Sequence, residues 1–153
     1  MLKDLSHVYL SGEKFPMKMD FIVLQQIQKE YGTIGEFELK LIGAEKVVDE
    51  DGKTKIVKKA EPNIETINFV LPKMILEGLE IENVEHAYTE KRLVQLIDMN
   101  IYVTADMIQQ ELAKALRVSL EKKENPSQRK AKKPKKNLLT LIGRIYSEWR
   151  NLG

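Results

Sequence analysis

Two short amphipathic helices joined at a glycine are predicted between residues 20 and 43, and this pair constrains the fold more than any other segment. Gly32 is expected to adopt the left-handed conformation that ends the first helix, and Thr33 precedes Glu36 at capping-box spacing. The hinge of this helical hairpin is therefore predicted at Tyr31, Gly32 and Thr33. In the first helix a capping aspartate is followed by apolar residues at helical spacing: Asp20, then Phe21, Leu24, Ile27 and Tyr31.

The second helix is expected to end at Gly43 and to bury one apolar stripe, which consists of Ile34, Phe37, Leu41 and Ile42. A β-hairpin is predicted before the helix pair, because residues 7–10 and 15–19 alternate in polarity around a turn sequence at 11–14. Pro16 lacks an N–H donor, so its strand should lie at an edge. The buried face of this hairpin is predicted to carry Val8, Leu10, Phe15, Met17 and Met19.

Three further helices are predicted downstream of a charged insert at residues 45–59, which is either an exposed hairpin or a loop. Asn63 can cap the first of them, and Pro72 should kink or divide it, because the proline ring clashes with the carbonyl four residues back. A short helix follows at residues 89–97, and Thr104 is expected to cap the longest one. The predicted inner residues are Ile64, Ile67, Val70, Leu71, Met74 and Ile75, then Ala105, Ile108, Leu112, Ala115, Leu116 and Leu120.

These elements predict an α+β fold that is predominantly helical, in which the N-terminal hairpin packs on five or six short helices. The formal net charge of +2 is unevenly distributed, because residues 122–136 contain eight lysines or arginines and one glutamate. That segment also contains two prolines and no apolar anchor, which is typical of a solvated linker. The chain is therefore divided into a globular body at 1–121, a basic flexible linker at 122–136 and a C-terminal element at 137–153.

The linker can be a soluble tether, or its lysines can bind nucleic acid by releasing phosphate counterions. No aromatic residue interleaves this run to stack on bases, and the body is acidic, so charge patterning favours the tether. The alternative function is a small nucleic-acid-associated regulator. The basic side chains concerned are Arg129, Lys130, Lys132, Lys133, Lys135 and Lys136.

A heptad seam marks the C-terminal element as a short amphipathic helix. A helix of this length is marginal in water, so its stripe must be buried against something. It either docks on the body or binds a partner's groove, with Trp149 as the anchor. The residues of this possible partner-binding face are Leu138, Ile142, Ile145, Tyr146, Trp149 and Leu152.

The sequence indicates no enzymatic chemistry. There is no cysteine, which excludes disulfides and thiolate sites, and the two histidines have no catalytic partners at suitable local spacing. No metal or cofactor site is expected; His86 is interpreted as a solvated surface histidine. No signal peptide and no membrane-spanning run is recognised, so the expected location is the cytoplasm.

The order and spacing of these segments resemble the tail assembly chaperones of long-tailed bacteriophages and prophages of low-GC Gram-positive bacteria. The resemblance covers roughly residues 7–120: a strand pair, a helix that stops at Glu30-Tyr31-Gly32, a second short helix, a Glu77-Gly78 helix end and two last helices. It implies a protein of the host cytoplasm that binds the tape-measure protein and helps recruit tail-tube subunits. Such proteins are absent from the finished virion, and self-association is possible. The family also implies a longer product made by programmed frameshifting near the basic run.

Overall fold

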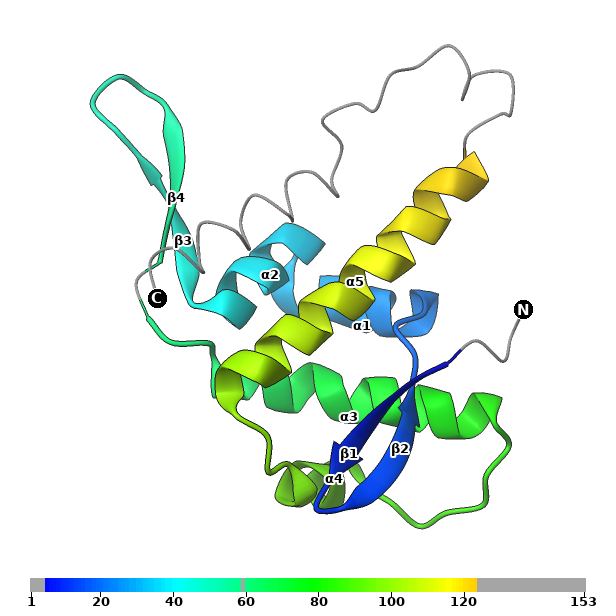
Figure 1. The fold of residues 1–153 in the computed structure, drawn as a ribbon. Helices are drawn as coiled ribbons and strands as arrows, with labels where there is room; N and C mark the ends of the chain where they lie inside the picture. Colours follow the sequence, from blue (N-terminus) through cyan, green and yellow to red (C-terminus); the bar gives the residue numbers. More distant parts are fainter. Residues whose placement is uncertain (1–4, 59, 124–153) are drawn as a thin grey trace.

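The computed structural model describes residues 5–58 and 60–123, with side chains described as far as Arg117. Figure 1 shows the arrangement of the elements, and the predicted α+β fold, with an N-terminal hairpin and five helices, is confirmed. No helix of the described residues has the length and apolar character that crossing a membrane requires. The elements are β1 (Ser6–Leu10), β2 (Glu13–Met17), α1 (Phe21–Tyr31), α2 (Ile34–Ile42), β3 (Ala44–Val48), β4 (Thr54–Lys58), α3 (Ile64–Ile81), α4 (Glu90–Leu96) and α5 (Ile101–Lys123).

The first hairpin pairs β1 and β2 in antiparallel register, with Val8 opposite Phe15. Ser11 and Gly12 both have positive φ in the connecting turn, which matches the twist of two right-handed strands. The chain leaving β2 docks on α3, where the Lys18 N–H donates to the Met74 carbonyl at 2.9 Å. All five side chains predicted for the inner face of the hairpin are buried.

The helical hairpin forms as the capping residues predicted. The Asp20 carboxylate accepts from the Val23 N–H at 3.0 Å, and the Thr33 hydroxyl accepts from the Glu36 N–H at 3.0 Å. Phe21 was expected inside but is 68% exposed, because the inner face of α1 is centred on Val23, Leu24 and Ile27. At about 100° of rotation per residue, Phe21 lies roughly a third of a turn away from that centre.

Helix α3 runs through Pro72 as one helix, so of the two expected outcomes, a kink or a division, the division does not occur. Pro72 is itself buried, and the helix contributes many other buried side chains to the core. Burial on this scale outweighs the loss of one backbone hydrogen bond inside the helix. Asn63 caps α3 as predicted, but Ile64 is 61% exposed, because it is the first helical residue and points outside the buried stripe.

Two further boundaries differ from the prediction. Helix α3 continues past Gly78 to Ile81, so the Glu-Gly pair lies inside the helix rather than at its end. Helix α5 begins at Ile101, because Asn100 accepts hydrogen bonds from the first N–H groups at 2.8 and 3.3 Å. Thr104 therefore does not cap α5. It is buried one turn inside the helix, where its hydroxyl donates to the Asn100 carbonyl.

The charged insert forms a second antiparallel hairpin, β3–β4, which projects away from the helices (Figure 1). A small separate cluster of Ile42, Ala44 and Ile56 lies at its base. Gly43 ends α2 in the left-handed region, and a side chain there would collide with the backbone of Ala60 and Glu61. The base of this hairpin therefore packs closely against the backbone of the residues that precede α3.

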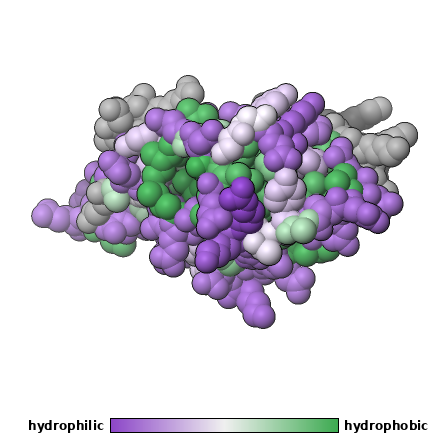
Figure 2. Space-filling model, turned by 90° about the horizontal axis from the view of Figure 1, so that it is seen from below, coloured by the Kyte–Doolittle hydropathy of each residue, from purple (hydrophilic) through white to green (hydrophobic). Residues whose placement is uncertain are grey.

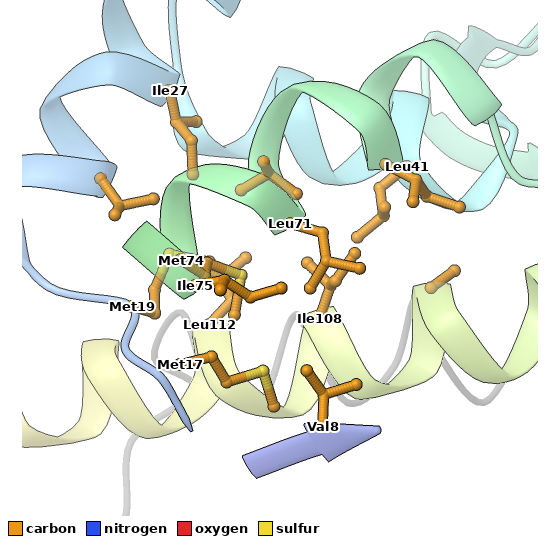
Figure 3. Packing of buried hydrophobic residues seen from close by; sticks show 14 of the residues in the cluster. Val8, Met17, Met19, Ile27, Leu41, Leu71, Met74, Ile75, Ile108 and Leu112 are labelled. Carbon is orange, nitrogen blue, oxygen red and sulfur yellow. The ribbon is translucent and has the colours of Figure 1, made fainter. Parts of the chain in front are cut away.

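One main core joins the first hairpin to α1, α2, α3 and α5 (Figure 3). Leu71, Met74 and Ile75 of α3 occupy its middle, facing side chains from β1, α1, α2 and α5. Helix α3 therefore organises the fold. The labelled side chains are Val8, Met17, Met19, Ile27, Leu41, Leu71, Met74, Ile75, Ile108 and Leu112.

Candidate functional site

A groove of about 630 Å³ lies between the first hairpin and the segment that follows α3. Its apolar lining comes from β2, the end of α3 and the following segment, and charged side chains stand around it. A hollow of this size can accept one or two side chains of a polypeptide. The lining residues are Glu13, Lys14, Phe15, Pro16, Leu79, Glu82, Val84, Glu85, His86, Ala87, Tyr88 and Arg92.

Tyr88 fixes the outer wall of the groove. Its hydroxyl donates to the Glu13 carboxylate at 2.7 Å, and its ring meets Phe15 edge-on with centroids 5.1 Å apart. The hydrogen bond to Glu13 raises the pKa of Tyr88 above its ordinary value. His86 stacks on the same ring at 5.8 Å and accepts from the Tyr88 N–H through Nδ1. These contacts hold residues 86–88 in place without a helix or strand.

Helix α3 ends in a turn just before the segment that lines the groove. Asn83 adopts φ 56°, and the Val84 N–H returns to the Leu79 carbonyl at 3.0 Å. This arrangement resembles the glycine-type helix end, with asparagine in the left-handed position. Val84 is left exposed beside the groove.

His86 is the histidine that lines the groove. Among the residues that the structure describes, it contacts Tyr88, and no serine, threonine or carboxylate hydrogen-bonds to it as a nucleophile–base set would require. The described residues contain no group of three or more histidines, cysteines or carboxylates suited to a metal ion. The groove thus provides apolar surface, hydrogen-bonding groups and charges of both signs.

Large apolar side chains also remain exposed elsewhere on the described surface. Phe21 and Ile22 are adjacent at the start of α1, with 68% and 53% exposure. Figure 2 views the molecule from below, where hydrophobic side chains gather near the middle of the face and hydrophilic ones surround them. The exposed large apolar residues are Tyr9, Phe21, Ile22, Val48, Ile64, Val84, Tyr102 and Val103.

The predicted hinge lies where the sequence placed it, between α1 and α2. Gly32 has φ 87° and ψ −52°, so its φ is positive as expected although its ψ lies outside the left-handed helical region. Tyr31 is half-buried and packs edge-on against Phe37 and Phe69, with both centroid distances 5.4 Å. Tyr31 and Thr33 therefore fix the two helix ends, and Gly32 makes the bend between them.

A buried carboxyl–amide contact joins α2 to α5, and sequence reasoning missed it. Glu38 is 2% exposed and Gln109 is 3% exposed, and Gln109 Nε2 lies 3.4 Å from Glu38 Oε2. Burial raises the pKa of Glu38 to about 7, although the hydrogen bond from Gln109 opposes this shift. The pair lies far apart in sequence, so helical periodicity at either position could not reveal it.

A second carboxyl contact links the start of α1 to α3. Burial raises the pKa of Glu77 to about 7, and hydrogen bonding to Asp20 adds to the shift, as do the charges of Asp20 and Glu80. Asp20 accepts the capping N–H of Val23 at the same time.

The other predicted site residues, in the basic linker and the C-terminal element, lie at 124–153 and outside the described residues. The structure therefore does not test whether the tryptophan face docks on the body or binds a partner. With the geometry described, comparison with known proteins gives no further assignment. No family model, no curated protein and no solved structure matches this chain.

Proposed function

We propose that this protein is a non-enzymatic chaperone of phage tail assembly. It binds the tape-measure protein, helps recruit tail-tube subunits and leaves before the virion is complete. The observation that carries this proposal is the order of the described elements. The N-terminal hairpin, the glycine-hinged helix pair and the last two helices follow one another in the order that the resemblance implies, although the Glu77-Gly78 pair lies inside α3 rather than at its end.

The described surface supplies apolar contacts suited to a reversible client complex. A chaperone that subunits must displace needs roughly micromolar affinity, which corresponds to about −8 kcal/mol. Burying one large apolar side chain contributes about 1.5–3 kcal/mol before the costs of association. Phe21 and Ile22, which are adjacent and exposed, therefore form the anchor for an apolar helix of the client.

Co-expression with the cognate tape-measure protein tests the proposed function. We expect the chaperone to increase the soluble yield of that protein and to co-purify with it. Phe21→Ser combined with Ile22→Ser should reduce this co-purification, because both substituted side chains are exposed and contribute little to the core. Gln25→Ser combined with Gln26→Ser is the matched control on exposed positions of the same helix. Unchanged solubility and no complex with the cognate partner would contradict the proposal.

A further inference from the structure

Glu38 occupies a position where a charged side chain is rarely found. It is buried in the interface between α2 and α5, and within the described residues it forms no ion pair. Carboxylates are almost never fully buried unless a partner compensates their charge. Its polar neighbour is Gln109, a neutral amide, so the charge of an ionised Glu38 would remain uncompensated.

The hydrogen-bonding groups of the Gln109 amide show which protonation state of Glu38 fits the interface. Gln109 Nε2 donates to Glu38, but the other amide atom, Gln109 Oε1, is buried and has no hydrogen-bond partner. An ionised carboxylate only accepts hydrogen bonds, so it has nothing to give this oxygen. A protonated carboxyl has one O–H donor beside one acceptor, which complements the donor and acceptor of a primary amide.

We propose that Glu38 carries a proton in the folded chain and forms a carboxylic acid–amide pair with Gln109, and that this pair is a latch between α2 and α5 that loosens when the proton leaves. In the closed latch, the Glu38 O–H donates to Gln109 Oε1 while Gln109 Nε2 donates to the other Glu38 oxygen. Both buried polar groups are then satisfied. The inference does not depend on the proposed function.

Among the described residues, the other charged groups on and around α2 have their own partners or are exposed, so Gln109 is the polar partner of Glu38. The elements that pack against α2 are α1, α3, β3 and α5. On α5, Asp106 accepts from Gln110 and Glu111 accepts from Ser6, while on α3 Lys73 pairs with Glu90. Glu77 of α3 is engaged with Asp20. The remaining charged side chains that the structure describes on these elements and on α2 are exposed: Lys29, Glu30, Glu36, Lys40, Glu45, Lys46, Glu65, Glu80, Lys114 and Arg117.

The helix ends allow α2 to respond to loss of the proton. In the closed latch, an ionised Glu38 is repelled by the amide oxygen of Gln109 and has lost its hydration. Separation of α2 from α5 relieves both the repulsion and the loss of hydration. Gly32 gives α2 a hinge with open space around it, whereas Gly43 is held against the backbone of Ala60 and Glu61. Helix α2 can therefore swing about its Gly43 end. That movement would uncover the apolar side chains buried beneath it, including Phe37 and Leu41.

The titration of Glu38 can be measured directly by carboxyl-carbon NMR on the full chain. We expect a midpoint near 7, well above that of exposed Glu36. When α2 separates from α5, the pKa of Glu38 returns to the ordinary carboxyl value. The equilibrium constant for this opening should therefore increase about tenfold between about pH 6 and about pH 8. Hydrogen exchange of the α2 amides, corrected for the intrinsic effect of pH, should show this loss of protection.

Glu38→Gln mimics the protonated acid, because its amide can exchange two hydrogen bonds with Gln109. In this variant the protection of α2 should no longer depend on pH over that range. Glu36→Gln, on an exposed position of the same helix, should behave like the wild type. A Glu38 midpoint near the ordinary carboxyl value would overturn the latch, as would an undiminished pH response in Glu38→Gln. If that variant does not fold, the wild-type titration decides alone.

Discussion

Gly32 adopts φ 87° between α1 and α2, a region that residues with a Cβ rarely occupy. No neighbouring atom would obstruct a Cβ there, so the cost of substitution is backbone strain rather than collision. Gly32→Val should therefore lower the free energy of unfolding by about 1–3 kcal/mol. Gly35→Ala should be neutral or mildly stabilising, because Gly35 is helical and its added Cβ would be 3.8 Å from the Thr33 hydroxyl. Denaturant unfolding followed by circular dichroism measures both, and equal effects would place the hinge elsewhere.

Gly78 has a different role, because it lets α3 approach the first hairpin. A Cβ at this position would lie 2.6 Å from the Pro16 carbonyl carbon and oxygen and 2.7 Å from the Met17 nitrogen. These are backbone atoms, so no side-chain rotation can relieve the collision. Gly78→Ala should therefore destabilise the protein by about 3 kcal/mol.

Gly35→Ala is again the matched control, since both glycines are helical and only Gly78 faces a close backbone. Chemical denaturation of the two variants gives the comparison. If Gly78→Ala gained stability, as alanine does at an open helical position, the close packing of α3 on β2 would be refuted.

At the scale of elements, the local signals in the sequence were sufficient for most boundaries. Caps such as Asp20, Thr33 and Asn63 act within three residues, so their chemistry can be read directly from spacing. The errors at Phe21 and Ile64 have another origin. Both are first residues of helices, where periodicity alone does not tell which face turns inward.

The candidate sites were less predictable, because they depend on contacts between distant segments. The groove unites β2 with residues 84–88, and the latch unites α2 with α5. Helical spacing places Glu38 within the predicted apolar stripe, four residues after Ile34 and three before Leu41, but it does not reveal the distant partner Gln109. The continuity of α3 through Pro72 was missed for a similar reason, because the packing that sustains it is tertiary.

The contact between α1 and α3 should make stability depend on pH through Glu77. Its pKa is raised from 4.5 to about 7 in the folded protein, so the folded state binds more protons than the unfolded state between these values. The contribution of Glu77 to stability is therefore present at acidic pH and is lost as pH rises through this window. Solvent screening keeps the effect small, because Glu77 is only partly buried.

Glu77→Gln should remove this part of the pH dependence, since an amide can donate to Asp20 without ionising. The free energy of unfolding of the variant, minus that of the wild type, should be larger at about pH 8 than at about pH 4. Thermal unfolding at both pH values provides the measurement, and Glu65→Gln, on an exposed position of the same helix, is the comparison. A constant difference between Glu77→Gln and wild type across this range would show that Glu77 ionises normally.

At the scale of the whole molecule, the basic segment and the rest of the chain have net charges of opposite sign. Residues 122–136 carry a local balance of +7, so the rest of the chain has a balance of −5. If the segment is a tether, binding to nonspecific duplex DNA should be weak at physiological ionic strength. A regulator would instead bind at low salt and lose affinity steeply as salt increases. A salt titration of duplex binding separates these functions, and strong, salt-sensitive binding would favour the regulator.

The C-terminal element provides the last test, because Trp149 is the only tryptophan of the chain. If residues 137–153 form a tethered partner-binding helix, their deletion should leave the thermal transition of the body nearly unchanged and weaken binding to a tail component. Trp149→Ala alone should reproduce much of that loss, because one large aromatic often dominates a small helical interface. In the free protein, the emission of Trp149 should be that of a solvent-exposed tryptophan. It should shift to the blue when the partner is added. Blue emission in the free chain, together with a lower melting temperature after deletion, would instead place this helix in the core and leave partner binding to the body.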